Sequence, residues 1–210
     1  MYTNFTYFTI KFIVRPPFFI MYPYKKYFEG KKKYKGGSIV VCNHQSAVDV
    51  PIIGAAAPYR TLFLAKKELF KGLKKRVLLG LGAVPVDRGN VGTDSLKTVV
   101  RLLKQGRDIV IFPEGTRVGS DGEIHAIKDG AAMFALMAKV PIRPLYIDKK
   151  ARLFRRTRIL FGKEIVLDEN LKADKEGVKF VSNLIAEELN RLKGKMAEIK
   201  KGKAKKEKDV

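Results

Sequence analysis

The residues best suited to proton transfer are a histidine and an aspartate within residues 43–49 (NHQSAVD). A carboxylate that accepts one imidazole N–H fixes the tautomer and leaves the other ring nitrogen as a general base. His44 and Asp49 are five residues apart, and on a regular helix this spacing puts two side chains about 140° apart. The pair can therefore meet only if His44 precedes a helix and Asp49 lies in the capping region of that helix.

The flanking sequence supports this arrangement. Residues 38–42 (SIVVC) form an apolar run typical of a buried strand, and open α/β sheets place their ligands where such strands end. Pro51 favours a helix that begins just before it, because proline is tolerated in a first helical turn. A histidine in a turn is more commonly a surface or capping residue, so the pair needs support from elsewhere in the chain.

Cys42 is the only cysteine in the chain. A single cysteine excludes an internal disulfide and a cysteine-based metal cluster, and a low cysteine content is typical of proteins in a reducing compartment. The position of Cys42 beside His44 raises the question of a cysteine nucleophile, but strand alternation places it on the same face as Val40, which favours a buried structural thiol. The second histidine, His125, is expected to be an ordinary exposed loop residue. Neither histidine has metal-ligand spacing with carboxylates, so we expect no metal site.

The chain is strongly basic. It holds 43 Lys and Arg against 21 Asp and Glu, a formal net charge of +22. Residues 193–210 contribute eight lysines and three acidic residues, which leaves +17 on the rest of the chain. The partner should therefore be acidic: an anionic membrane, a phosphate-bearing substrate, an acidic carrier protein or nucleic acid. We do not expect nucleic acid, because the basic residues are scattered through the chain and no nucleic-acid-binding signature is present.

Residues 1–29 are rich in aromatic and aliphatic side chains but are interrupted by Lys11, Arg15, Pro16 and Pro17. A spanning helix needs about 20 consecutive apolar residues, and a signal peptide needs a basic start and a small-residue cleavage site. Neither pattern is present. The segment instead predicts one or two short helices in the headgroup layer of a membrane, or alternatively a helix pair packed on the core. We expect peripheral attachment to the cytoplasmic face of the cell membrane.

Strand patterns alternate with helix patterns along the chain, which indicates a single-domain α/β sandwich with a largely parallel central sheet. The length is sufficient for one substantial core. We expect an N-terminal membrane-associating helical segment, a catalytic domain and a Lys-rich flexible tail, with boundaries at residues 1–29, 30–192 and 193–210. Strands are predicted at 38–42, 61–65, 82–89, 108–112, 142–147 and 157–162, and helices at 51–57, 66–81, 93–105, 130–139 and 173–192.

Polar residues also follow two other predicted strands. Arg88 ends one of them, while Glu114, Gly115 and Arg117 follow another. If the strands are parallel, these residues share one edge of the sheet with His44. Arginine can bind a phosphate with two parallel hydrogen bonds, and Gly115 permits a tight turn and close backbone approach. Glu114 could orient an arginine or accept a substrate hydroxyl.

Four short blocks, NHQSAVD, AVPVDR, FPEGTR and VPIRP, occur in this order over residues 43–144. They resemble the four motif blocks of the glycerolipid acyltransferases, and most closely those of the bacterial 1-acylglycerol-3-phosphate (lysophosphatidate) acyltransferases. The first and third blocks are specific in combination. Arg143, in the fourth block, departs from the apolar run that the family often shows, and this difference bears on the head group of the acceptor.

The resemblance implies an enzyme that moves a fatty acyl group from a thioester to the free hydroxyl of lysophosphatidic acid, giving phosphatidic acid for phospholipid synthesis. The donor would be acyl-CoA or an acidic acyl carrier protein, with no further cofactor. The resemblance implies that His44 is the catalytic base and Asp49 its partner. It also implies that the phosphorylated acceptor is bound by Arg88, Glu114, Gly115, Thr116 and Arg117.

Two alternatives remain open from the sequence. The first is a related acyltransferase with another acceptor, such as glycerol 3-phosphate or a lyso-aminolipid. The second is a basic protein without catalysis that binds membranes or nucleic acid. Product analysis with several lysolipid acceptors and both kinds of thioester would distinguish them.

Overall fold

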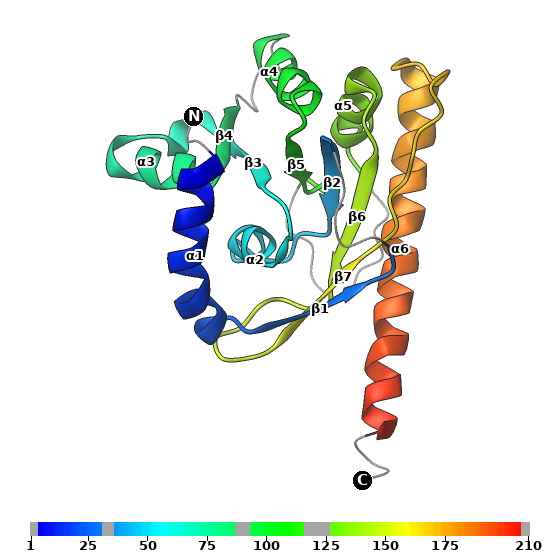
Figure 1. The fold of residues 1–210 in the computed structure, drawn as a ribbon. Coiled ribbons are helices and arrows are strands. Elements are labelled where there is room, and N and C mark those ends of the chain that lie inside the picture. The colour runs from blue at the N-terminus through cyan, green and yellow to red at the C-terminus, as the bar shows by residue number, and fades with distance from the viewer. Residues whose placement is uncertain (1–3, 31–35, 87–92, 116–126, 207–210) are drawn as a thin grey trace.

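One sheet forms the centre of the protein, whose computed structural model describes residues 4–30, 36–86, 93–115 and 127–206. Across these ranges seven strands are arranged in the order β1-β7-β6-β2-β5-β3-β4 (Figure 1). The strands are β1 Tyr24–Phe28, β2 Ser38–Cys42, β3 Thr61–Lys66, β4 Ala83–Val86, β5 Asp108–Ile111, β6 Ile142–Ile147 and β7 Thr157–Phe161.

Strand direction places five carboxyl ends at one edge of the sheet. β6, β2, β5, β3 and β4 are parallel to one another. β7 is antiparallel to β6, and β1 runs parallel to β7. Val41 in β2 is level with Ile111 in β5, so the segments that follow these two strands leave the sheet side by side. The largely parallel sheet expected from the sequence is confirmed.

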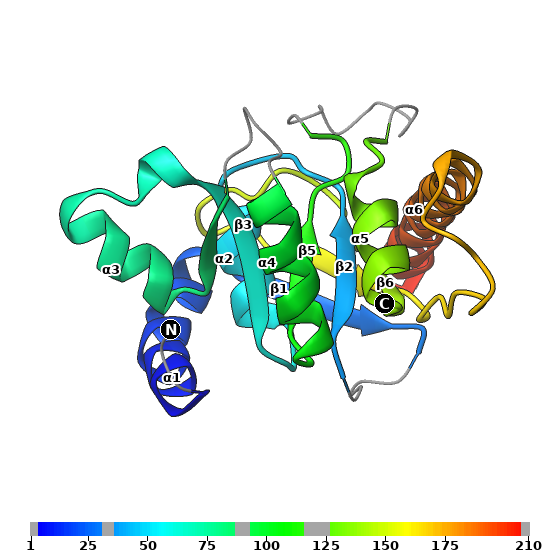
Figure 2. The same cartoon turned by 90° about the horizontal axis from the view of Figure 1, so that it is seen from above.

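Helices cover both faces of the sheet. Residues of α4, α5 and α6, such as Val99, Ala135 and Ile185, are buried with Ile39 on one face. On the opposite face, α2 packs its apolar side chains against β2 and β5. Figure 2 shows α4 and α5 crossing one side of the sheet, with α2 on the other. The helices are α1 Asn4–Met21, α2 Asp49–Ala56, α3 Gly72–Gly80, α4 Thr93–Lys104, α5 Gly130–Ala138 and α6 Lys175–Lys206, with a short 3-10 turn at Lys67–Leu69.

The N-terminal segment differs from the prediction of one or two short helices over residues 1–29. Its described part contains a single helix, α1, which includes Pro16 and Pro17, and then a strand, β1, that pairs along its length with β7. The side chain of Tyr24 explains why this part of the segment is extended. It is buried, and its hydroxyl donates to the carbonyl of Ala55 in α2 at 3.1 Å. The sheet therefore begins before residue 30.

The C-terminal helix also differs from the prediction. The sequence predicted a helix over residues 173–192 followed by a flexible tail, 193–210, but α6 continues to Lys206. Leu192, Met196 and Ile199 lie three or four residues apart, so they share one face of the helix. That face packs against Tyr146 and Leu160 of the sheet. The apolar contacts of this face extend the helix beyond the predicted boundary.

Arg143 lies at the amino edge of the sheet, away from the strand ends that carry His44. Its guanidinium donates to Asp108 at 2.8 Å and to Glu164 at 2.9 Å, and Ser38 donates to the same Asp108 carboxylate at 2.7 Å. Burial raises the pKa of Asp108, and the hydrogen bond from Ser38 opposes this rise. Arg143, which interrupts the apolar run common in the family, therefore forms part of an internal ion pair. What this difference means for the head group of the acceptor stays a prediction.

This network gives a test of stability. We expect Asp108→Ala to lower the free energy of unfolding by about 3–5 kcal/mol, because it leaves the buried Arg143 without its main counter-charge. Urea unfolding measures the loss. Glu198→Ala is the matched control, since it breaks an exposed pair with Lys195 and should cost less than about 1 kcal/mol. Equal losses in the two variants would contradict the assignment.

Candidate active site

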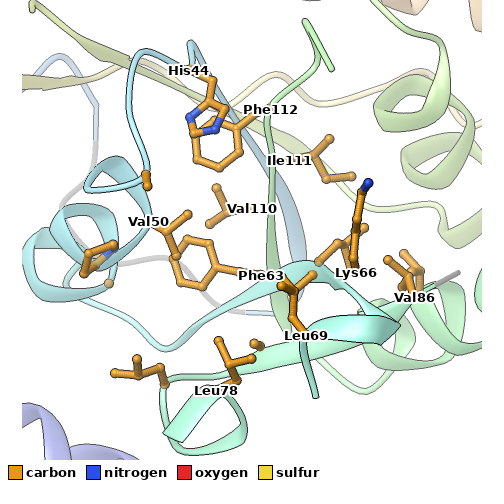
Figure 3. Close-up of a pocket in the computed structure, with 18 of the residues that line it drawn as sticks. His44, Val50, Phe63, Lys66, Leu69, Leu78, Val86, Val110, Ile111 and Phe112 are labelled. Atoms are coloured by element: carbon orange, nitrogen blue, oxygen red, sulfur yellow. The ribbon is translucent and has the colours of Figure 1, made fainter. Parts of the chain in front are cut away.

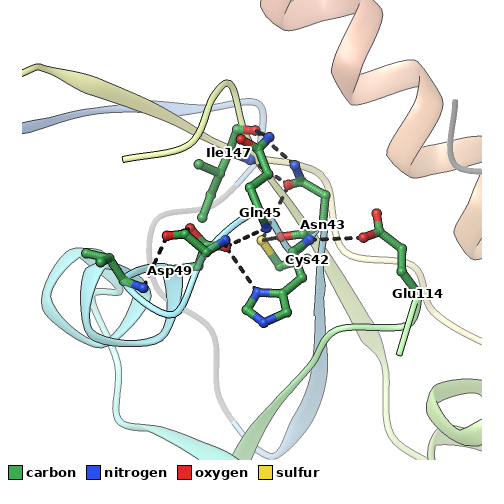
Figure 4. Close-up of polar contacts among 9 residues, drawn as sticks. Cys42, Asn43, Gln45, Asp49, Glu114 and Ile147 are labelled. Atoms are coloured by element: carbon green, nitrogen blue, oxygen red, sulfur yellow. Dashed lines mark hydrogen bonds and ion pairs between the residues drawn. The ribbon is translucent and has the colours of Figure 1, made fainter. Parts of the chain in front are cut away.

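The histidine and aspartate predicted from the sequence are in contact. Nδ1 of His44 lies 3.0 Å from Oδ2 of Asp49 (Figure 4). His44 is in the segment that follows β2, and Asp49 is in the first turn of α2. Because a carboxylate can only accept, Nδ1 carries the hydrogen, and Nε2 of the neutral ring presents a lone pair. Nε2 makes no hydrogen bond with the described part of the chain. This is the geometry that a general base and an orienting carboxylate require.

Asp49 is fully buried, and its carboxylate organises the turn before α2. Besides the imidazole, Oδ2 accepts the backbone N–H groups of Gln45 and Ser46, each at 2.7 Å. Oδ1 accepts the Ser46 hydroxyl at 3.3 Å. Asp49 was predicted in the capping region, but Val48 is the N-cap and Asp49 lies inside the helix. Its charge is favourable there because the first turn of a helix carries a partial positive charge.

The imidazole is also supported on its face. The ring of Phe112, just after β5, stacks on it with centroids 4.0 Å apart. On the other side of the turn, Asn43 and Gln45 donate side-chain amide hydrogens to the carbonyl of Ile147, each at 3.0 Å. Asn43 also accepts the Ile147 N–H at 2.8 Å. Asn43, Gln45 and Phe112 were not among the site residues predicted from the sequence. The signals for them are two amide side chains that flank the histidine and an aromatic residue before Pro-Glu-Gly.

Glu114 and Gly115 lie beside the pair formed by His44 and Asp49, called the dyad below, as expected from the parallel strands. The carboxylate of Glu114 accepts the backbone N–H of His44 at 3.3 Å, so it holds the loop that bears the imidazole. Burial raises the pKa of Glu114, and the hydrogen bond from His44 opposes the rise. Gly115 has φ +70°, and a Cβ at this position would lie within 2.8 Å of the Lys128 ammonium and closer still to its methylenes. The absence of a side chain at Gly115 thus lets Lys128 cross over the turn.

Three residues of the predicted acceptor site, Arg88, Thr116 and Arg117, lie outside the described residues, as does His125. Their roles stay predictions. The chain enters these segments from Val86 and from Gly115, and both of these residues line the same cavity as His44.

The cavity beside the dyad has a volume of about 1060 Å³ and is lined mainly by apolar side chains. Figure 3 shows His44 and Phe112 at one end, with Phe63 in the middle and Leu69 and Leu78 at the other. Side chains from α1, α2, α3, α5 and several strands contribute to its wall, so no short stretch of sequence could have revealed it. A cavity of this size and polarity can hold a long apolar chain next to the imidazole.

The environment of Cys42 excludes it as the nucleophile. The thiol is completely buried, and burial raises its pKa well above the usual value. It donates to the carbonyl of Asn43 at 3.2 Å. The reactive form of cysteine is the thiolate, which this environment disfavours, so the prediction of a buried structural thiol is confirmed. In the ranges that the structure describes, no three histidine, cysteine, aspartate or glutamate side chains are grouped as ligands for a metal ion.

Comparison with known proteins places these features in a family. The family model described as Acyltransferase matches residues 25–148. A 1-acyl-sn-glycerol-3-phosphate acyltransferase of Bacillus subtilis (strain 168) is 41% identical over 115 residues, which are 51% of this chain and 54% of the relative. One from Streptococcus pneumoniae is 34% identical over 162 residues, which are 73% of this chain and 60% of the relative.

A solved structure agrees with these sequence relatives. The 1-acyl-sn-glycerophosphate (LPA) acyltransferase PlsC from Thermotoga maritima superposes with a TM-score of 0.59 at 26% identity, covering 80% of this chain and 72% of that one. The chain spans between half and two thirds of the length of the curated relatives just named. The matched residues run from the second residue of β1 to the residue after β6 and include the histidine–aspartate pair and all four motif blocks. The chain therefore belongs to the acyltransferase family.

Proposed function

We propose that the protein transfers a fatty acyl group from a thioester donor to the free hydroxyl of lysophosphatidic acid, giving phosphatidic acid. The observation that carries the proposal is the contact of His44 Nδ1 with the buried carboxylate of Asp49 at the end of a long apolar cavity. The names of the relatives from B. subtilis and S. pneumoniae and of the T. maritima structure support the same reaction.

In the proposed reaction, Nε2 of His44 takes the proton from the acceptor hydroxyl as its oxygen attacks the thioester carbonyl. The ring becomes an imidazolium, which Asp49 stabilises through Nδ1–H. The tetrahedral oxyanion then collapses, the C–S bond breaks, and the imidazolium returns its proton to the leaving thiolate. The products are an ester and a free thiol, and no acyl-enzyme forms. The donor is acyl-CoA or an acyl carrier protein.

The positions of Asp49 and Phe112 suit this role. Three N–H groups hold one carboxylate oxygen, and the aromatic ring fixes the plane of the imidazole. A side chain held in this way loses little freedom when substrate binds, which is how orientation lowers a barrier. General base catalysis contributes about 10²- to 10⁴-fold. The rest must come from substrate positioning and stabilisation of the oxyanion.

The phosphate of the acceptor would bind beside the dyad, where Gly115 begins the Gly-Thr-Arg stretch. Arg88, Thr116 and Arg117 are the proposed ligands, with Gly115 allowing close approach of the backbone. Glu114 was expected to contact the acceptor, but its hydrogen bond to His44 N–H supports a different task, that of setting the position of the base. Lys128, which crosses over Gly115, adds a cation at this point.

The protein is also proposed to work at a membrane surface, because both its acceptor and its product are lipids. α1 exposes large apolar side chains, among them Phe12, Ile13 and Ile20. Such a helix with basic residues around it binds the interface of an anionic bilayer. Within the described residues, no helix is both long and apolar enough to cross the bilayer. We propose peripheral attachment to the cytoplasmic face of the cell membrane.

The role of the base has a direct test. His44→Ala should lower kcat for acyl transfer to lysophosphatidic acid by at least about 10²-fold, since it removes the general base. Mass spectrometry of the phosphatidic acid product measures the rate, and thermal unfolding checks that the fold is intact. His125→Ala is the matched control and should keep full turnover. A folded His44→Ala protein with turnover near that of the unsubstituted protein would refute the proposal.

The acceptor site is tested by Arg117→Ala. A hydrogen bond to a charged group contributes about 1.5–3 kcal/mol, so the variant should lower kcat/KM for lysophosphatidic acid by roughly tenfold to a hundredfold. The KM for the thioester should change little. Arg101→Ala, an exposed arginine in α4, controls for the loss of one positive charge. Equal effects on acceptor and donor would count against a phosphate contact at Arg117.

The cavity is tested through the preferred length of the acyl chain. Leu78 lies at the end far from His44 (Figure 3), so Leu78→Ala should shift the preference toward longer donors and Leu78→Phe toward shorter ones. Each methylene of the acyl chain that becomes buried in the cavity, or is excluded from it, changes the free energy by about 0.8 kcal/mol, which is roughly fourfold in relative kcat/KM. Competition between donors of different length measures the shift. Val166→Ala, at an exposed residue, should leave the preference unchanged, and a uniform loss for all donors at Leu78 would contradict the model of an acyl cavity.

A further inference from the structure

The connection between β6 and β7 presents two apolar side chains at the tip of a tight turn. The backbone N–H of Arg155 donates to the carbonyl of Arg152 at 3.1 Å. Leu153 and Phe154, the two residues between them, are 51% and 71% exposed. We call these four residues the 152–155 turn. Large apolar residues at a solvent-facing tip contribute nothing to the core of the protein.

The backbone at the tip makes this choice of residue more unusual. Phe154 has φ +55°, a left-handed conformation that is disfavoured for a bulky side chain and is normally occupied by glycine or asparagine in such turns. The aromatic side chain therefore carries a steric cost as well as an exposure cost in the folded protein. The folded chain alone gives no reason for phenylalanine at position 154, which points to a contact with a surface outside the protein.

The turn is attached to the end of the N-terminal helix. The backbone N–H of Phe154 donates to the carbonyl of Met21, the last residue of α1, at 2.7 Å. Figure 1 shows the connection between β6 and β7 passing the lower end of α1. Ile20 and Met21 are themselves 67% and 44% exposed. Two segments more than 130 residues apart in sequence thus bring exposed apolar side chains to one end of the molecule.

The charged residues next to the tip, within residues 149–156, are all basic. The segment 149–156 has no acidic residue, and none of its charged side chains forms an ion pair with the described part of the chain. An aromatic and aliphatic tip within a ring of cations matches the acyl boundary and the anionic headgroups of a bilayer. The exposed basic residues are Lys149, Lys150, Arg152, Arg155 and Arg156.

We propose that the 152–155 turn inserts Leu153 and Phe154 into the headgroup layer of an anionic membrane, as a second contact beside α1. Two contacts joined by a hydrogen bond fix the orientation of the molecule on the bilayer, which a single helix cannot do. Arg15 and Phe18 of α1 also line the cavity that holds His44, so the same orientation brings the cavity wall next to lipid. The proposal concerns binding and holds whether or not the protein transfers acyl groups.

Because the chain contains no tryptophan, a single substitution provides a reporter. Phe154→Trp in the full chain should show a blue-shifted emission with phosphatidylglycerol vesicles, and brominated phosphatidylglycerol should quench it. Phe180→Trp is the matched control, since Phe180 is 57% exposed on α6, on the side of the molecule away from α1 in both views (Figures 1 and 2). Its emission should not change.

A second variant measures the contribution to binding. Leu153→Ser with Phe154→Gly removes the apolar tip, and glycine suits the φ of residue 154, so thermal stability should be retained. Flotation should show at least about tenfold weaker partition into phosphatidylglycerol vesicles, while Phe180→Ser partitions normally. Unchanged partition, or a Phe154→Trp emission that ignores vesicles, would overturn the proposal. An emission shift that appears without vesicles when the protein concentration is raised would also overturn the proposal, because it would mean that residue 154 contacts a second copy of the chain.

Discussion

A buried carboxylate controls the geometry of the whole site. Asp49 is inaccessible to water, so its charge must be compensated by hydrogen bonds from the protein. Two backbone N–H groups, one hydroxyl and the His44 ring provide them. The turn between β2 and α2 can fold only in a way that delivers these donors, and the same condition fixes the plane and the tautomer of the imidazole. The position of the imidazole is therefore a consequence of satisfying one buried charge.

The sheet supplies the second part of the site through strand direction. β2, β5 and β6 are neighbours and run the same way, so the residues after them converge. His44 follows β2, Phe112 and Glu114 follow β5, and Ile147 ends β6. From β5, Phe112 stacks on the imidazole and Glu114 accepts the backbone N–H of His44; from β6, the carbonyl of Ile147 accepts the side-chain amides of Asn43 and Gln45. The imidazole is thus held on several sides by rigid elements, as a preorganised site requires.

The sequence predicted the local elements better than the features that depend on distant contacts. Apolar runs and helix periodicity placed β2, β3, β5, β6 and β7 and the cores of α2, α4, α5 and α6, and the spacing of His44 and Asp49 predicted their contact. The strand at Tyr24 was missed because its stability comes from pairing with β7, more than 130 residues away. The continuation of α6 was missed because Met196 and Ile199 are buried only by Tyr146 and Leu160. The cavity is assembled from many elements, so no local pattern records it.

The ion pair of Arg143 and Asp108 sits at the opposite edge of the sheet from His44. The Arg143–Asp108 ion pair and the His44–Asp49 pair therefore occupy opposite ends of the same parallel strands. Substitutions in the loops at the carboxyl edge can change which ligand is bound without weakening the Arg143–Asp108 ion pair at the amino edge, since distant sites contribute almost independently to stability. This division gives the scaffold room to diversify its ligands during evolution, or in the laboratory, while the sheet beneath stays the same.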